Sequence, residues 1–301
     1  MFRKHLVWLV CIMALMGVVL ISGCGNQEAE NQEGLQIVTS ISILSDLAEN
    51  IVGERGTVDF LVPVGDNPED YEPLPSDMQK VSNAAVLFVN GWGLEEGIER
   101  SMAQITENIV FVTEGITPIP LVGEDAPDPH AWFDASLVAD FYIENILTVL
   151  VELDPAGAEE YVGNAAAYVA DLKELDTWIK EQAKQIPEDN RVIVVSENAL
   201  KYFGEAYDFQ TEGIWELNSH EEGTPQQMSR VVDLVLETSI PAVFVETTVD
   251  PRYMTIISSE TGVPITGEIY TDALGLPGSG ADTYIKMMEY NTNVFVQGLG
   301  K

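Results

Sequence analysis

The chain has 301 residues, and its 49 Asp and Glu outnumber its 14 Lys and Arg, which gives a formal net charge of −35 at pH 7. This acidity excludes nucleic acid as a partner, because phosphate contacts need a basic surface. The hydrophobic share of 46% supplies enough apolar side chains for folded cores, so disorder cannot be the main state. The length suffices for two lobes of ordinary domain size.

Residues 1–23 have the pattern of a signal peptide. Arg3 and Lys4 precede an uncharged apolar run over 6–22, slightly short for a membrane span. The run ends in Leu-Ile-Ser-Gly-Cys, which resembles the lipobox of bacterial lipoproteins, where the cut precedes the cysteine and its thiol carries a lipid. We therefore expect an exported protein, lipid-anchored at Cys24 on the outer face of the cell membrane or in the periplasm. An uncleaved anchor or a signal cleaved elsewhere are the alternatives.

The polar residues 24–34 predict a flexible tether between this lipid and the folded chain. From residue 35 to 153, short β-rich runs alternate with helical segments, which predicts βαβ units and a parallel sheet. The expected strands cover 36–41, 58–62, 86–89 and 109–112, and the expected helices cover 44–52, a segment from Pro75, and 94–105. Ser76 followed by Gln79 predicts a capping box at the start of the middle helix.

A single long helix is predicted over 154–187. It begins at Pro155 and ends before Pro187. Apolar residues spaced by alternating fours and threes keep one stripe on one face; they are Tyr161, Ala165, Tyr168, Leu172, Leu175 and Ile179. Roughly thirty residues make a rod of about 45 Å, which would restrict hinge motion if it packed along both halves. A coiled-coil dimer seam is the alternative for the stripe.

The alternation restarts in residues 188–301. Strands are expected over 192–195, 213–215, 242–245 and 265–269, and helices over 199–207, 225–237, 252–260 and 283–299. The predicted fold class is therefore α/β, with two lobes that each contain a parallel sheet flanked by helices. One long rigid helix joins the lobes.

Several stretches of the chain together resemble a known family. They are "LVPVGDNPEDYEPLPSDM", "DPHAWFD", "VVSENALKYFGEAY", "EEGTP" and "YTDALG" with the later "DTYIKMMEYN". With the lipobox, they are similar to the metal-binding receptor lipoproteins of zinc/manganese ABC importers, and more narrowly to the manganese-type branch. The likeness covers nearly the whole chain after the signal. It implies two α/β lobes, a long linking helix, and one divalent metal ion held in the cleft by four ligands from four loops.

The resemblance implies a ligand set of Glu69, His130, Glu197 and Asp272. Glu69 is the departure, because the family's usual Asp-Pro-His-Glu-Tyr-Glu-Pro is here Asn-Pro-Glu-Asp-Tyr-Glu-Pro, with Glu69 where a histidine is expected. Asp70 or His220 could serve instead. Each of the four positions follows an expected strand or precedes the next helix, where ligands bind in parallel α/β sheets.

Three carboxylates and one imidazole form a hard donor set, which suits Mn²⁺ or Fe²⁺ better than Zn²⁺ by ligand type, although affinity order favours Zn²⁺ at most sites. The resemblance therefore implies a monomeric receptor, not an enzyme, that transfers Mn²⁺, or else Zn²⁺ or Fe²⁺, to a membrane permease and its ATPase. A surface adhesin with a degraded site and a metallohydrolase remain the alternatives. No Walker A, Gly-x-Ser-x-Gly or HExxH pattern is present.

Overall fold

The computed structural model describes residues 34–123, 125–218 and 223–300. The expected signal peptide, Cys24 with nearly all of the tether, and His220 lie outside these ranges.

The first half of the described chain contains a four-stranded parallel sheet. Its strand order is β2-β1-β3-β4. The strands are β1 (Leu35–Thr39), β2 (Gly56–Phe60), β3 (Val86–Val89) and β4 (Ile109–Phe111). All four residues of β3 are buried, as expected for an inner strand covered on both faces. The strands predicted in this half are confirmed, with ends that shift by up to two residues.

Helices connect these strands, as predicted; they are α2 (Ser42–Val52), α3 (Pro75–Asn83) and α4 (Glu96–Met102). The predicted capping box of Ser76 and Gln79 is wrong. Helix α3 starts at Pro75 as expected, but its N-cap is Leu74, two residues before Ser76, and the Asp77 carboxylate accepts the backbone N–H of Leu74 at 2.8 Å. Proline at the first helical position favours this start, because it has no N–H to satisfy.

Two helical segments lead out of the first half. The first runs from α5 (Ala135–Leu137) through a π-helical turn (Val138–Tyr142) into α6 (Ile143–Leu153). The second is α7 (Ala158–Ala183), which follows a 3₁₀ turn at Pro155–Gly157. The predicted long helix is confirmed, and every residue of its apolar stripe is buried.

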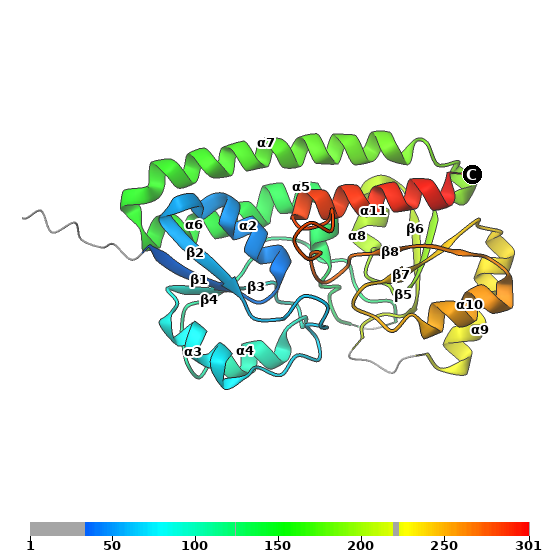
Figure 1. Ribbon diagram of the computed structural model, residues 1–301, viewed down its shortest axis with the longest axis horizontal. Coiled ribbons are helices and arrows are strands. Elements are labelled where there is room, and N and C mark those ends of the chain that lie inside the picture. Colours follow the sequence, from blue (N-terminus) through cyan, green and yellow to red (C-terminus); the bar gives the residue numbers. More distant parts are fainter. Residues whose placement is uncertain (1–33, 124, 219–222, 301) are drawn as a thin grey trace, which may run out of the picture. The chain divides into compact units, whose positions relative to one another are not determined.

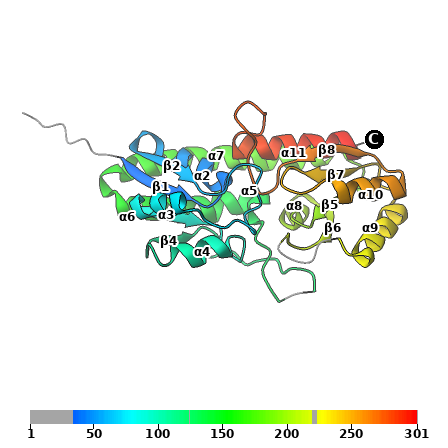
Figure 2. The ribbon, with the colours of Figure 1, turned by 60° about the horizontal axis from the view of Figure 1, so that its bottom comes forward.

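Helix α7 packs within its own chain. It contacts α2, α5 and α6 from the first half and α8 (Lys201–Tyr207) and α11 (Tyr284–Leu299) from the second. Figures 1 and 2 both show α7 running beside elements of both halves. Its stripe therefore belongs to the internal core, and the coiled-coil alternative is wrong.

The second half contains two parallel strand pairs. Strand β5 (Val192–Glu197) pairs with β6 (Gln210–Trp215), and β7 (Val243–Glu246) pairs with β8 (Ile265–Ile269). Helices α9 (Pro225–Thr238) and α10 (Arg252–Thr261) complete this half with α8 and α11. The expected parallel strands are confirmed, and so are the helices that accompany them.

The Glu246 side chain lies between the carboxyl ends of β5 and β7. Strands β5 and β7 lie side by side, but the Glu246 carboxylate accepts the backbone N–H groups of Ser196 and Glu197, each at 2.8 Å. These N–H groups are therefore not available to a ladder between the two strands. The sheet consists of two hydrogen-bonded pairs, where the sequence pattern suggested one continuous sheet.

A continuous apolar core runs from the first half to the second. It includes residues of β1, α2, α7, α8 and α11, while a smaller core lies around β6, α9 and α10. Trp132 joins the halves directly: its indole Nε1 donates to the Thr271 carbonyl at 3.1 Å, and its own carbonyl accepts the Tyr284 hydroxyl at 2.6 Å. Shared burial of this kind limits how freely the two halves can separate.

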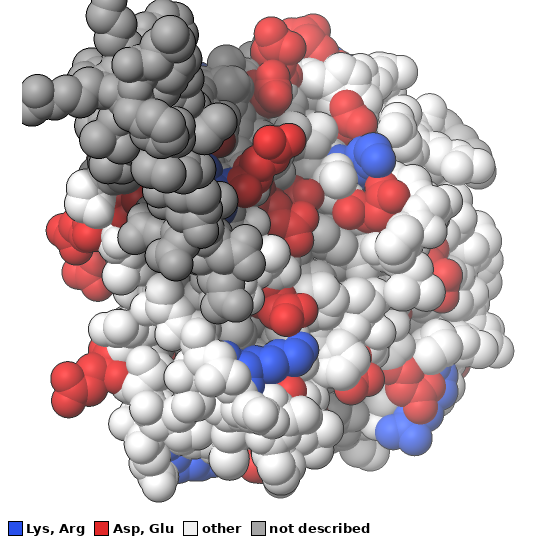
Figure 3. Space-filling view, turned by 60° about the vertical axis from the view of Figure 1, so that its left-hand side comes forward, with Lys and Arg blue, Asp and Glu red and all other residues white. Residues whose placement is uncertain are grey.

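Acidic side chains recur over the face that Figure 3 displays, and basic ones are few. This agrees with the net charge of −35. Among the described residues, no helix combines the length and the apolar composition needed to cross a membrane.

Candidate metal centre

His130 lies fully buried in the loop that precedes the 3₁₀ turn Ala131–Phe133. The Asp128 carboxylate accepts both the backbone N–H of His130 and its ring Nδ1, each at 2.9 Å. Trp132 packs edge-on against the imidazole, with ring centroids 5.1 Å apart. These contacts hold the ring in one orientation and leave Nε2 as the free ring nitrogen.

Glu197 ends strand β5 and is also buried. Its Oε2 accepts the side-chain amide of Asn218 at 2.5 Å, and Asn218 in turn accepts the Trp215 indole N–H at 2.9 Å. Gly213 on the neighbouring strand β6 lets the backbone at Asn198 approach closely, because a Cβ at residue 213 would clash with the backbone nitrogen of Asn198. Among the described residues, Oε1 of Glu197 has no hydrogen-bond partner.

Asp272 follows strand β8 and has the same kind of support. Its Oδ2 accepts the hydroxyls of Thr248 and Thr271, at 2.8 and 3.2 Å. Its Oδ1 has no such partner among the described residues. As with Glu197, one carboxylate oxygen is fixed by hydrogen bonds, and the other remains available to a ligand.

The ring nitrogen and the two carboxylate oxygens that these supporting contacts do not use face one another. Nε2 of His130 lies 3.6 Å from Oε1 of Glu197 and 3.5 Å from Oδ1 of Asp272. Each of these buried atoms lacks a hydrogen-bond partner in the part of the chain that the structure describes. Unpaired buried polar atoms are costly and rare, so three that face one another require an explanation. A cation between them would satisfy all three.

Glu69 approaches the same place from the loop between β2 and α3. One of its carboxylate oxygens lies within 4.8 Å of ligand atoms of both His130 and Glu197. Asn67 shapes this loop, since its Oδ1 accepts the backbone N–H of Glu69 at 3.0 Å. Asp70, the alternative, has an exposed side chain that accepts the Asn67 amide at 3.2 Å. The structure thus brings Glu69, His130, Glu197 and Asp272 together and leaves Asp70 at the surface.

Crowded charges shift the pKa values of this cluster. Burial, together with the carboxylates of Glu69 and Asp272, raises the pKa of Glu197 well above its usual value. Burial alone would lower the pKa of His130, but the carboxylates of Asp128 and Asp272 outweigh it and raise that pKa to about 10. In the metal-free chain His130 therefore holds its proton at neutral pH, and a divalent cation bound at Nε2 would have to displace it.

The comparisons with known proteins agree with this geometry. Residues 37–298 match the family described as the periplasmic zinc-uptake complex component A, ZnuA. The chain belongs to this family. It is 55% identical to the manganese-binding lipoprotein MntA of Halalkalibacterium halodurans, over 97% of this chain and 99% of that protein. It is 36% identical to the manganese ABC transporter substrate-binding lipoprotein scaA of Streptococcus gordonii, over 96% and 98% of the two chains.

Solved structures show the same fold. This ZnuA-family chain superimposes on the periplasmic zinc-binding protein TroA of Treponema pallidum with a TM-score of 0.85, at 26% identity over 89% of this chain and 100% of TroA. The Mn-bound periplasmic metal-binding protein of Candidatus Liberibacter asiaticus gives a TM-score of 0.81, at 29% identity over 87% and 98% of the two chains. The expected family and fold class are confirmed.

Sequence reasoning missed the residues that support this centre. Asp128 stood within the quoted Asp-Pro-His motif, and an Asp two residues before a buried His is a natural acceptor for it. Asn218, Thr248 and Lys201 gave no signal, because each meets its partner only through the fold.

Proposed function

We propose that this chain is the extracytoplasmic receptor of an ABC importer and captures a divalent transition metal, Mn²⁺ first, with Zn²⁺ or Fe²⁺ as other possible cargo. The observation that carries the proposal is the convergence of three buried ligand atoms on His130, Glu197 and Asp272, none of which has a hydrogen-bond partner among the described residues. The relatives include a manganese-binding lipoprotein and a manganese ABC transporter substrate-binding lipoprotein, which supports the same cargo.

Glu69, His130, Glu197 and Asp272 are the proposed ligands. Three carboxylates and one imidazole present hard oxygen donors, which suit Mn²⁺ by ligand type. With a divalent ion this set carries a net charge of −1, and the amide of Asn218 and the hydroxyls of Thr248 and Thr271 offset part of it by hydrogen bonding. The chain is proposed to bind and release its cargo, not to transform it.

The N-terminal residues attach the receptor to the membrane, and the folded part holds the cargo. Residues 1–23 serve as a lipoprotein signal peptide, Cys24 carries the lipid, and residues 24–34 form the tether. The N-terminal lobe (35–153), the linking helix (154–187) and the C-terminal lobe (188–301) enclose the cargo. The monomeric receptor delivers it to a membrane permease and its ATPase.

Calorimetry on the full-length chain in detergent tests the proposal. The chain is stripped with a chelator and titrated with Mn²⁺, Fe²⁺ and Zn²⁺ in excess Mg²⁺ and salt, because an acidic surface collects divalent ions loosely. One saturable site is expected, weakened at least tenfold by Glu69→Ala and by Asp272→Ala. Asp70→Ala is the matched control, because it removes an equal charge one residue away and should leave binding unchanged.

The alternatives predict other results. A chain without a saturable site contradicts the proposal and favours a lipoprotein with a degraded site and a role in attachment. Metal-dependent turnover of an ester or amide substrate would instead indicate a metallohydrolase, because hydrolysis needs a metal-bound water and an open substrate position.

A further inference from the structure

We propose that Lys201 is a positioning residue for the ligand His130, and that through it a displacement between the two lobes reaches the bound ion. The inference rests on the proposed function, because it takes the ion as cargo that must be both held and released. Among the described residues, the Lys201 ammonium pairs with Asp128 and Glu216, neither of which is a proposed ligand.

The contacts form a continuous chain from helix α8 to the centre. The Lys201 ammonium lies 2.8 Å from Oδ2 of Asp128, whose Oδ1 holds Nδ1 and the backbone N–H of His130. Lys201 is the first residue of α8 in the C-terminal lobe, whereas Asp128 and His130 belong to the N-terminal lobe. The orientation of one ligand thus depends on a side chain from the opposite lobe.

Two neighbouring side chains, Tyr202 and Glu216, bind the segment that leads to His130. The Tyr202 hydroxyl donates to the Asp128 carbonyl at 2.9 Å and accepts the backbone N–H of Ile119 at 3.0 Å. Glu216, which follows strand β6, accepts the backbone N–H of Val122 at 2.8 Å. Glu216 also lies 2.6 Å from the Lys201 ammonium. Three side chains from the C-terminal lobe therefore anchor the segment that carries His130.

Burial explains why Lys201 matters to His130. The Asp128 side chain is fully buried, and that of Lys201 is 9% exposed. Loss of the ammonium would leave this buried carboxylate with His130 as its remaining ion-pair partner among the described residues, and removing one partner of a buried ion pair is destabilising. Without the ammonium, Oδ2 of Asp128 would turn towards solvent, and the hydrogen bonds of Oδ1 to His130 would turn with it.

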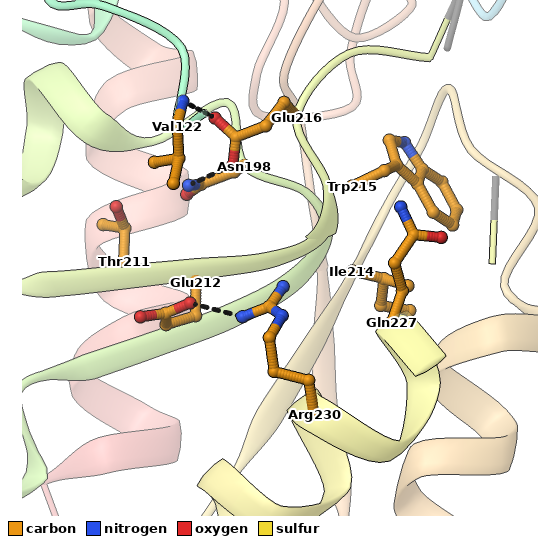
Figure 4. Close-up of a pocket in the computed structure, with 9 residues that line it drawn as sticks. All are labelled: Val122, Asn198, Thr211, Glu212, Ile214, Trp215, Glu216, Gln227 and Arg230. Atoms are coloured by element: carbon orange, nitrogen blue, oxygen red, sulfur yellow. Dashed lines mark hydrogen bonds and ion pairs between the residues drawn. The ribbon is translucent and has the colours of Figure 1, made fainter. Parts of the chain in front are cut away.

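The outer end of this chain of contacts lies beside an open pocket. A pocket of about 480 Å³ is lined by Glu216, Asn198 and Val122, among others. Figure 4 shows the Glu216 carboxylate reaching both the Val122 N–H and the Asn198 amide across one side of it. Movement of the loop at Val122 away from β6 would break this contact first, and Glu216 and Lys201 would then shift together.

Kinetics separate this role from a merely structural one. Mn²⁺ release from the full-length chain in detergent is measured by stopped-flow mixing with excess chelator. Lys201→Met keeps the length of the side chain and removes its charge, so release is expected to become 10- to 100-fold faster, the usual range for loss of a group that orients a ligand. Lys201→Arg should restore most of the wild-type rate.

Lys180→Met is the matched control. Lys180 also pairs with an acid, Asp176 at 2.8 Å, but on the exposed side of α7. Its release rate should equal that of the wild type. Equal rates in Lys201→Met and wild type would overturn the inference, and so would equal acceleration in Lys201→Met and Lys180→Met, because the effect would then be general electrostatics.

A second measurement uses the metal-free chain. The Nδ1–H of His130, held by Asp128, should give a slowly exchanging proton resonance that disappears in Lys201→Met and persists in Lys180→Met. If Lys201→Met does not fold, Glu216→Gln replaces it in both measurements. Faster Mn²⁺ release and faster exchange of the His130 proton are then expected. Unchanged values of both would overturn the inference. Absence of Mn²⁺ binding in the wild type would count against the proposed function instead, and the proton measurement would still decide the role of Lys201.

Discussion

The Ser40 hydroxyl donates to the Glu95 carboxylate at 2.5 Å inside the first half of the chain. Glu95 also accepts the backbone N–H groups of Asn90 and Gly91, at 2.7 and 3.0 Å. In the second half, the Ser196 hydroxyl and the backbone N–H groups of Ser196 and Glu197 meet the Glu246 carboxylate in the same way. Each half therefore ties the end of its first strand to the end of its third through one buried glutamate.

These glutamates make stability depend on pH. Burial raises the pKa of Glu95 to about 7, against 4.5 for an ordinary glutamate, and the same holds for Glu246. The folded chain keeps these protons to higher pH than the unfolded chain does, so the free energy of unfolding should fall as pH rises from about 5 to about 7.5. Glu95→Gln removes one ionisation, and its free-energy difference from wild type should change by ~3 kcal/mol over this range.

Urea unfolding of the metal-free chain at several pH values measures this effect. Glu96→Gln is the matched control, because it removes the same charge from an exposed neighbour and should follow the wild-type curve. Parallel curves for Glu95→Gln and wild type would show that Glu95 is ionised throughout, and would remove it as a source of the pH dependence.

The identity of residue 69 should set the preference among metals. Glu69→His replaces a hard carboxylate oxygen with an imidazole, which favours Zn²⁺ over Mn²⁺. We expect the ratio of Zn²⁺ to Mn²⁺ affinity to rise at least tenfold, measured by calorimetric competition with a chelator. Asp70→His adds an imidazole next to the site and should leave the ratio unchanged. An unaltered ratio in Glu69→His would mean that Glu69 does not contact the ion.

Metal binding should release protons. Because its pKa is raised to about 10, His130 holds its proton at pH 7 in the metal-free chain, and burial with nearby carboxylates raises the pKa of Glu197, so that it keeps its proton to higher pH than an ordinary glutamate does. Mn²⁺ must displace these protons, so affinity should increase about tenfold for each proton released per pH unit between pH 6 and 8. Titrations in buffers of different ionisation enthalpy count the protons. A binding enthalpy that is the same in every buffer would contradict this account.

Local patterns explain which features the sequence could predict. The stripe from Tyr161 to Ile179 and the buried run of β3 follow from periodicity and burial alone, and the structure has both. The contact of Glu246 with Ser196 was not predictable, because the two residues lie fifty positions apart in the sequence. The cap of α3 was misplaced by two residues, because Asp77 competes successfully with Gln79 for the same helix end.

The same distinction applies to the candidate centre. The four proposed ligands came from short motifs that a resemblance could place one by one. Lys201 and Asp128 are separated by 73 residues, and no local pattern relates an ammonium on one helix to a carboxylate on a distant loop. The groups that orient the ligands therefore became visible only in three dimensions.

Asn218 should control affinity without contacting the ion. Its side-chain oxygen accepts the Trp215 indole, so its amide is turned towards Glu197, to which it donates at 2.5 Å. Asn218→Asp keeps the shape but places a second carboxylate against Glu197 and removes the donor, so Mn²⁺ affinity should fall 10- to 100-fold. Asn108→Asp, which alters an exposed amide far along the chain, is the control for added charge. Calorimetry measures the Mn²⁺ affinity, and circular dichroism checks that each variant is folded. An affinity within twofold of wild type in a folded Asn218→Asp chain would show that the orientation of Glu197 does not depend on Asn218.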